Sequence, residues 1–347
     1  MFKKILIPLD GTENAEQIGG WAVGLAQSIG ANVALLAVID PEEIEFPEST
    51  PYAANPTPGR AAAQDRPGFE TPAMGSSGMA TVAMGPSMGH GEPVRHAAGY
   101  GTQMVEQAAE YARRYLAREA ERVDVSGVKV TTHVQIGSPA AVIVEQAQKL
   151  GADIIAISTH RGSALARGIL GSVTDRVLHS ATVPVLTVHP QGLASFRGNA
   201  GAPNAIIVAL DGSERAEEAV PVALEIAEAC GSEVVFLQSV RFPYYGVGGP
   251  GVEYYGGDYG IAEQRREALD SLSKFVKLAT EKGVKARAHA AVGSPAARII
   301  EEAENTEGAM IVMTTRGASG IRRWVLGSVT DKVVRSSGRP VLVLRSK

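Results

Sequence analysis

The chain repeats itself, and this repetition restricts the possible folds more than any other feature of its 347 residues. The hexapeptide LGSVTD occurs at 170–175 and again at 326–331, an offset of 156 positions. Residues 134–147 match 290–303 at the same offset. A sequence that repeats over such lengths is expected to hold two copies of one domain.

The front of each copy matches at a different offset, which locates an insertion. Residues 5–16 correspond to 206–217, an offset of 201 positions, so the first copy is about 45 residues longer in between. The extra segment is rich in Pro, Gly, Ala, Ser and Met without apolar periodicity, so we expect a flexible insert. The sequence predicts a first domain over 1–190 with the insert at about 41–99, a linker over 191–203 and a second domain over 204–347.

Within each copy, short apolar runs alternate with stretches of helical periodicity. Residues 3–10 form an apolar run that ends in a polar turn, as expected of a strand buried on both faces. Apolar residues then recur at helical spacing over 18–29. This alternation predicts an α/β fold with two repeated, doubly wound, Rossmann-like parallel sheets of five strands, each in the order 3-2-1-4-5.

Single residues predict where helices begin and bend. Thr12 can cap the first helix, and Ser138 and Ser294 each precede a proline, the usual order of an N-cap and a first helical residue. Gly20 and its counterpart Pro221 lie inside the helix that follows the first strand, so we expect a bend there.

Composition argues against several classes of function and location. The formal net charge of −4 disfavours non-specific binding to nucleic acid or to an anionic membrane surface. No run reaches the ~18 apolar residues of a membrane span, and the first ten residues do not resemble a signal peptide. Cys230 is the single cysteine, so an intrachain disulfide is excluded; we interpret it as a small buried residue and expect a cytoplasmic protein.

The ends of two strands carry the residues that indicate a ligand. The first strand ends in LDGT at 9–12 and in LDGS at 210–213. Ligands of doubly wound sheets bind beyond the carboxyl ends of the strands, where the winding reverses. If the first and fourth strands are neighbours, their ends share one site, and Asp10 and Asp211 there suit a ribose hydroxyl or a metal-bound phosphate.

The loop after the fourth strand leads into a helix that opens with Gly171 and Ser172, or with Gly327 and Ser328. A helix N-terminus attracts phosphate through its backbone N–H groups and its positive dipole end, glycine permits close approach, and serine adds a hydroxyl donor. The plainer alternative is that Gly-Ser is only a helix cap and Asp-Gly-Thr only a turn. Recurrence of both features in both copies favours a phosphate site.

With these features the chain resembles the tandem universal stress proteins, a family of adenine-nucleotide-binding α/β domains, over nearly its whole length apart from the insert. The family's nucleotide motif reads G-x2-G-x9-G-[S/T]. The second copy has Thr314 at the first position and Gly317 at the second, before Gly327 and Ser328.

The first copy departs further from this motif. Ser158 and Arg161 stand at the two leading glycine positions, with Gly162 one place late, before Gly171 and Ser172. The second copy is therefore the closer match, and we expect it to bind the nucleotide more tightly.

The resemblance implies one ATP site in each copy, with or without Mg²⁺, a role in stress tolerance, and an apolar residue at the end of the second strand against the adenine. In the first copy the implied residues are Asp10, Val38, Ser158, Arg161, Gly162, Gly171, Ser172 and Val173. In the second copy they are Asp211, Val240, Thr314, Gly317, Gly327, Ser328 and Val329.

The family resemblance also implies dimers that pair their last strands. The apolar strands expected at 184–188 and 340–344 would be sheet edges if unpaired, and such edges invite association. We predict that they pair with each other as a pseudo-dimer within one chain. A homodimer of the whole chain and unidentified protein partners stay open.

Three functions stay open. The first choice is a non-enzymatic nucleotide-binding regulator, the second a nucleotide-independent interaction or scaffolding protein, and the third a weak ATPase. The chain lacks a G-x4-G-K-[ST] loop, so it is not a P-loop ATPase. His160 lies next to the predicted phosphate site and could carry a proton, but its counterpart Arg316 could not.

The insert contains a methionine-rich segment. Met74, Met79, Met84 and Met88 lie close to His90 in the sequence. Thioethers with an imidazole suit Cu(I), and flexible methionines also suit an adaptable partner surface. A loosely packed loop without either role is the simplest interpretation.

Deletion of residues 50–95 should leave the fold of the second domain and its ATP binding intact, because the insert lacks the apolar periodicity needed to bury a core. Thermal unfolding followed by circular dichroism, together with titration with ATP, checks this prediction. Loss of the cooperative transition in the deletion variant would mean that the insert is structural.

Overall fold

The structure is a computed structural model that describes residues 2–43, 94–124, 127–159, 170–189, 193, 201–240, 257–315 and 326–345. The first half contains β1 (Lys4–Pro8), α1 (Glu13–Ile29), β2 (Asn32–Ile39), α2 (Val94–Asp124), β3 (Val130–Ile136), α3 (Pro139–Lys149), β4 (Ile154–Ser158), α4 (Ser172–Ser180) and β5 (Val185–Val188). The second half contains β6 (Ala205–Leu210), α5 (Glu214–Glu217), α6 (Ala219–Cys230), β7 (Glu233–Val240), α7 (Gly257–Glu281), β8 (Ala286–Val292), α8 (Pro295–Asn305), β9 (Ala309–Thr314), α9 (Ser328–Ser336) and β10 (Val341–Leu344).

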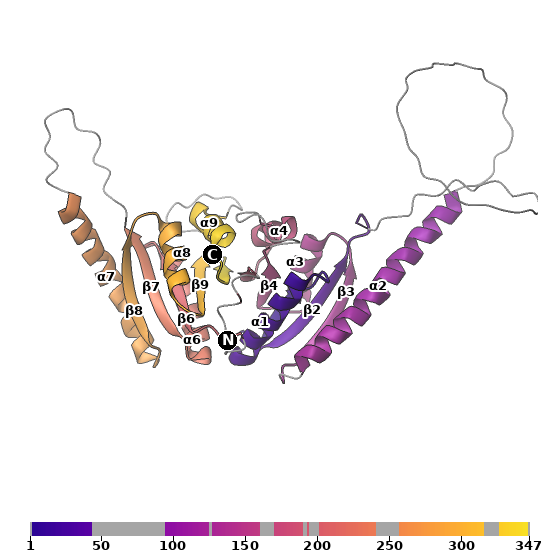
Figure 1. Cartoon of the computed structure of the whole chain (residues 1–347), viewed down its shortest axis with the longest axis horizontal. Coiled ribbons are helices and arrows are strands. Elements are labelled where there is room, and N and C mark those ends of the chain that lie inside the picture. Colours follow the sequence, from indigo (N-terminus) through magenta and orange to yellow (C-terminus); the bar gives the residue numbers. More distant parts are fainter. Residues whose placement is uncertain are drawn as a thin grey trace, which may run out of the picture.

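The strands form one continuous sheet in the order β3-β2-β1-β4-β5-β10-β9-β6-β7-β8 (Figure 1). Each half thus has the predicted order, with neighbouring strands parallel. The halves join through the antiparallel pair β5–β10, in which Val341 lies opposite Thr187, and Leu342 opposite Leu186. The predicted pairing of the two last strands within one chain is therefore confirmed.

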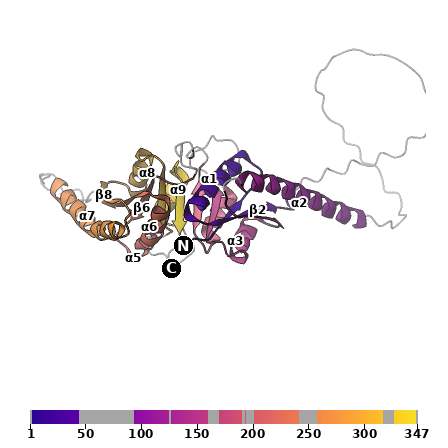
Figure 2. The ribbon, with the colours of Figure 1, turned by 90° about the horizontal axis from the view of Figure 1, so that it is seen from below.

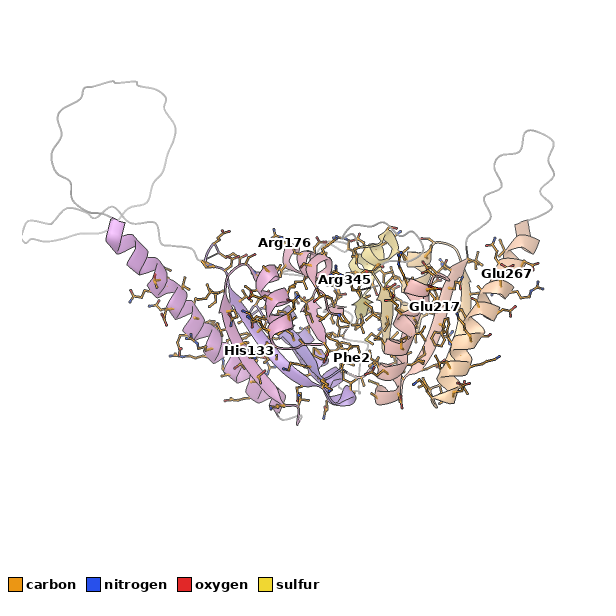
Figure 3. All side chains as sticks on the ribbon, turned by 180° about the vertical axis from the view of Figure 1, so that it is seen from behind. Phe2, His133, Arg176, Glu217, Glu267 and Arg345 are labelled. Atoms are coloured by element: carbon orange, nitrogen blue, oxygen red, sulfur yellow. The ribbon has the colours of Figure 1, made fainter. Side chains whose placement is uncertain are left out.

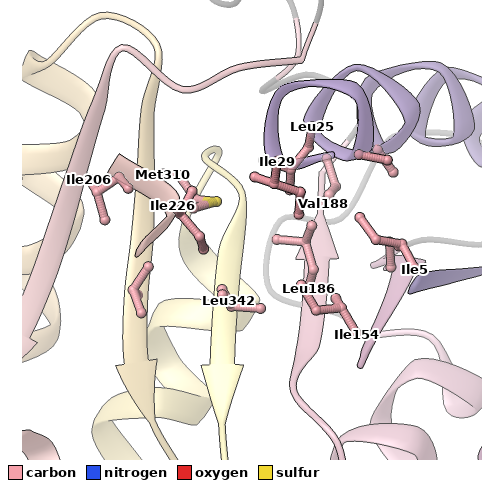
Figure 4. Packing of buried hydrophobic residues seen from close by; sticks show 14 of the residues in the cluster. Ile5, Leu25, Ile29, Ile154, Leu186, Val188, Ile206, Ile226, Met310 and Leu342 are labelled. Atoms are coloured by element: carbon pink, nitrogen blue, oxygen red, sulfur yellow. The ribbon is translucent and has the colours of Figure 1, made fainter. Parts of the chain in front are cut away.

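Two layers of helices cover the sheet, as expected for strands that are apolar on both faces. Along β1, Ile5 and Ile7 face the layer of α1, α2, α6 and α7, whereas Leu6 faces the layer of α3, α4, α8 and α9. The first layer forms one core across both halves, where Leu186 and Leu342 lie side by side on the neighbouring strands β5 and β10 (Figure 4). In the view of Figure 2, α1 and α6 lie near the centre of the molecule, and these two helices pack against each other.

The helix after the first strand differs between the halves. In the first half, α1 continues without interruption through Gly20. The helix is therefore not broken at the position where a bend was expected. In the second half the helix is divided into α5 and α6 at Glu218. Pro221 lacks an N–H, and its ring would collide with the carbonyl group of Glu217 one turn earlier. A glycine removes no hydrogen bond, which explains why only the second copy is divided.

Most of the predicted helix starts are confirmed. The Thr12 hydroxyl accepts a hydrogen bond from the backbone N–H of Ala15 at 3.3 Å. Ser138 and Ser294 are the N-cap residues of α3 and α8, although neither side chain makes the capping hydrogen bond. The proline that follows each serine is sufficient to favour the start, because its fixed φ matches the first helical turn.

The insert and the linker are described in part. Helix α2 begins at Val94, inside the segment predicted as the insert at about 41–99, and residues 44–93 lie outside the described part. At the end of the linker, Gly201 has a φ of +89° and lies against α1. A Cβ there would stand 2.7 Å from the Cα of Gly24 and from the backbone nitrogen of Leu25, so only glycine fits.

Polar and sulfur groups also meet between the halves. The backbone N–H of Phe2 donates to Glu225 Oε1 at 3.1 Å, and Arg345 Nη1 donates to the carbonyl oxygen of Ala181 at 2.9 Å. Cys230 ends α6 and packs against the shared core, but it is half-buried rather than buried as expected. Burial raises the pKa of the Cys230 thiol to about 11, although a hydrogen bond with Ser28 acts in the opposite direction, so this thiol stays protonated at neutral pH.

Gly201→Ala should lower the free energy of unfolding by at least about 2 kcal/mol more than Gly30→Ala. Gly30 is the matched control: its φ of +69° is also left-handed, but a Cβ there would meet nothing within 4 Å. The comparison therefore isolates the collision with α1 from the backbone strain. Denaturant unfolding of the two variants measures the difference, and equal losses would show that the linker does not need to touch α1.

Candidate functional site

Each half has a cavity at the carboxyl ends of its strands. The first cavity measures about 130 Å³ and the second about 810 Å³. The first is lined by Pro8, Leu9, Asp10, Ala15, Leu36, Val38, Glu43, Pro139, Ile143, Ile157, Ser158, Gly171, Ser172, Val173 and Thr174. The second is lined by Ala209, Leu210, Asp211, Gly212, Ala216, Gln238, Ser239, Val240, Gln264, Glu267, Ala268, Ser271, Pro295, Ile299, Met313, Thr314, Gly327, Ser328, Val329 and Thr330.

One wall of each cavity is an acidic corner between the first strand and the first helix. Asp10 Oδ1 accepts hydrogen bonds from the Thr12 hydroxyl at 2.6 Å and from the Thr12 backbone N–H at 3.1 Å. Asp211 and Ser213 repeat both bonds at the same distances. The glycine between them has a φ of +78° in the first half and +81° in the second, which favours glycine. The carboxylate is therefore fixed at the strand end.

The opposite wall is the start of the last helix in each half. Gly171 is the N-cap of α4, and its own N–H donates to the carbonyl oxygen of Thr159 at 2.9 Å. The first helical hydrogen bond runs from the N–H of Asp175 to the carbonyl oxygen of Gly171. The backbone N–H groups of the first turn precede this hydrogen bond, so they point out of the N-terminal end of the helix, which faces the cavity. The side chain of Ser172 is exposed there.

The second half repeats this arrangement. Gly327 caps α9, and its N–H donates to the carbonyl oxygen of Thr315 at 2.8 Å.

Buried threonines fix both helix starts to the strand ends, a role that was not predicted from the sequence. The hydroxyl of Thr174 donates to the carbonyl oxygen of Ser158 at 2.5 Å, and that of Thr330 donates to Thr314 at 2.9 Å. The only signal available was their place in the repeated hexapeptide.

The structure brings the described candidates of each copy onto one cavity. In the first half these are Asp10, Val38, Ser158, Gly171, Ser172 and Val173. In the second half these are Asp211, Val240, Thr314, Gly327, Ser328 and Val329. Outside the described residues lie the candidates Arg161, Gly162 and Gly317, together with His160, Arg316 and the methionine-rich segment.

The match between Val38 and Val240 is wrong by one residue. Strands β2 and β7 align from Asn32 and Glu233, so the counterpart of Val38 is Ser239. Ser239 lines the second cavity, and its hydroxyl donates to the carbonyl oxygen of Gly293 at 2.8 Å. Val240 also lines the cavity, but its side chain packs with residues beneath α7, because successive side chains of a strand point to opposite faces.

The aspartate of the hexapeptide has a structural role. Arg335 of α9 donates from Nη2 to Asp175 of α4 at 2.8 Å and from Nε to Asp331 of its own helix at 2.7 Å. The hydrogen bond with Asp331 raises the pKa of Arg335, and burial opposes that shift. One guanidinium therefore links the first turns of α4 and α9 across the two halves. In the first copy His179 holds the equivalent position, with Nδ1 2.7 Å from the carbonyl oxygen of Asp175.

No helix in the part of the chain that the structure describes is long and apolar enough to cross a membrane.

Comparison with known proteins identifies the family. The model of the universal stress protein family matches residues 1–68, 87–189 and 204–345. Universal stress protein MJ0531 of Methanocaldococcus jannaschii is 34% identical over 142 residues, which cover 40% of this chain and 81% of that protein.

Two matches cover nearly the full length. A universal stress protein of Mycolicibacterium smegmatis is 24% identical over 345 residues, 99% of this chain and 97% of that protein. The crystal structure of a universal stress protein from Archaeoglobus fulgidus DSM 4304 shares the fold with a TM-score of 0.60 at 19% identity, covering 99% of this chain and 98% of that chain. Since the family model matches most of the sequence, the chain belongs to the universal stress protein family.

Proposed function

We propose that this protein is a non-enzymatic, ATP-binding regulator of the stress response, which binds the nucleotide with or without Mg²⁺. One observation carries the proposal: in each half a fixed aspartate and the glycine-capped start of a helix face the same cavity. These are the two kinds of group that a nucleotide requires, a carboxylate for ribose hydroxyls or a metal-bound phosphate, and helix amides for phosphate. Membership of the universal stress protein family supports the proposal.

The phosphate would lie against the first turn of α4 or α9. Because the N–H of Gly327 already donates to Thr315, the donors in the second half are the amides from Ser328 onward, with the Ser328 hydroxyl. Gly327 contributes by leaving room, since any side chain on it would stand at the helix start. Charge-assisted hydrogen bonds of this kind are each worth about 1.5–3 kcal/mol.

A regulatory role is preferred to an enzymatic one because the two copies share the binding groups but not a proton carrier. His160 in the first copy corresponds to Arg316 in the second. A scaffolding protein that needs no nucleotide is the second candidate, favoured by the Arg335 bridge and the continuous sheet, which make the chain rigid without a ligand. We also propose a cytoplasmic location, because a single, half-buried cysteine that forms no intrachain disulfide suits a reducing compartment.

Native mass spectrometry of the purified chain separates these candidates. Co-purified ATP or ADP, or a mass increase after ATP is added, supports the regulator. A chain that stays without nucleotide at millimolar ATP supports the scaffold. Release of phosphate from added ATP, measured in the same sample, supports the weak ATPase.

The two sites should be unequal, with the second binding ATP more tightly. The second cavity is the larger, about 810 Å³ against about 130 Å³. At the second motif position the sequence has Gly317 where the first copy has Arg161, and a side chain crowds the approach of a phosphate to the backbone.

Gly327→Val should weaken ATP binding at the second site by about 100-fold or more, because a displaced phosphate loses at least two helix amides. Gly171→Val should reduce total binding by less. Both residues have φ near −60°, a conformation open to any residue, so the variants should fold. Isothermal titration with ATP measures both affinities and the stoichiometry.

Gly171→Ala and Gly327→Ala are the matched controls, since a single methyl group fills less of the cavity than valine does. At Gly171, a Cβ would lie at an ordinary 3.5 Å from the carbonyl oxygen of Thr159. Equal losses from the two valine variants, or a larger loss from Gly171→Val, would reverse the ranking and indicate that Arg161 is a ligand.

A further inference from the structure

The two halves differ at one pair of equivalent positions, Tyr115 on α2 and Ser271 on α7, of which only Ser271 lines the cavity of its own half. The helices align at the offset of the repeat: Leu116 and Leu272 are both fully buried. The glycines that follow the helices, Gly127 and Gly283, both have left-handed φ values, of +75° and +73°. Position 115 of the first half therefore corresponds to position 271 of the second.

In the first half an aromatic ring fills the space beside the acidic corner. Tyr115 is only 8% exposed and packs in the core beside Leu116. Burial, followed by the nearby carboxylates of Glu16 and Glu119 and more weakly that of Asp10, raises the pKa of its hydroxyl. None of the described side chains of α2 lines the first cavity.

In the second half the same space is open and polar. The Ser271 hydroxyl lies 3.2 Å from Gln238 Oε1 and 2.8 Å from the carbonyl oxygen of Ala268. The Gln238 amide stands beside the acidic corner, where Nε2 would be 3.7 Å from a Cβ on Gly212. We define the α7 lobe as the part of the second cavity lined by Gln238, Gln264, Glu267 and Ser271.

The hydrogen-bonding groups and charges of the α7 lobe determine which ligand groups can bind there. Its amides and hydroxyl donate and accept hydrogen bonds, whereas Glu267 on α7 (Figure 3) and Asp211 at its border bring negative charge. A phosphate would be repelled there, so the phosphates stay at the start of α9. A neutral group with its own donors and acceptors fits the lobe.

We propose that the second cavity accepts adenine nucleotides that carry a neutral, hydrogen-bonding substituent on the ribose, and that the substituent occupies the α7 lobe. The ribose faces the lobe because Asp211, the residue suited to its hydroxyls, lies on the border. The first cavity has no lobe lined by the described side chains of α2, so we expect it to admit only the unsubstituted nucleotide. This inference rests on the proposed function and specifies the ligand class of that site.

The probe is 2′/3′-O-(N-methylanthraniloyl)-ATP, which adds a neutral group with one N–H donor and one carbonyl acceptor to the ribose. Its fluorescence and its competition with ATP are measured on the full chain carrying Gly171→Val, so that the second cavity is observed alone. We expect its affinity there to lie within about threefold of that of ATP. Ser271→Tyr should lower the ratio of the two affinities by about tenfold or more, because the ring refills the lobe.

Ser273→Tyr is the matched control, with the same change on an exposed position of α7 that does not line the cavity. It should leave both affinities unchanged, and thermal unfolding should confirm that both tyrosine variants fold. A ratio unmoved by Ser271→Tyr while ATP still binds, or rejection of the probe by the unmodified lobe, overturns this inference alone. Failure of ATP itself to bind overturns the proposed function.

Discussion

The antiparallel pairing of β5 with β10 is the interaction on which the rest of the structure depends. Every residue of the two strands is buried, and each strand would be an exposed apolar edge if the halves separated. Full burial of one such Val or Leu side chain is worth about 1.5–3 kcal/mol, and separation of the halves would expose part of this apolar surface again. The same pairing brings α1 against α6, which merges the two cores into one.

Each residue type of the repeated hexapeptide has its own role in this arrangement. Its leucine is buried in the core, its glycine caps a helix, and its threonine fixes that helix to the end of a strand. Its aspartate meets Arg335 across the boundary between the halves. The start of each last helix is therefore held from two sides, by its own strand and by the other half. A helix N-terminus fixed in this way is preorganised for an anion, because no ordering is needed when the anion binds.

Within this shared backbone the two halves have diverged through single side chains. Pro221 divides a helix that stays whole around Gly20. Ser271 stands where the first half has Tyr115, and the two cavities differ severalfold in volume. None of these changes alters the strand order, since the sheet depends on apolar residues that both copies keep. Duplication thus preserves a scaffold while each cavity acquires its own shape and charge.

The sequence by itself determined the repeat, the alternation of strands and helices, their order in the sheet and the two strand ends that form each candidate site. These features depend on periodicity and on local signals such as Asp10 before a glycine, which act over a few residues. The offset of 201 residues already pairs Val38 with Ser239, and the tertiary structure decided that Val240 lies on the other face of the sheet, because a shift of one residue reverses the side chain. It also decided the bridge of Arg335 to Asp175 and the lobe beside Ser271. Those depend on contacts between residues far apart in the chain, which no local pattern records.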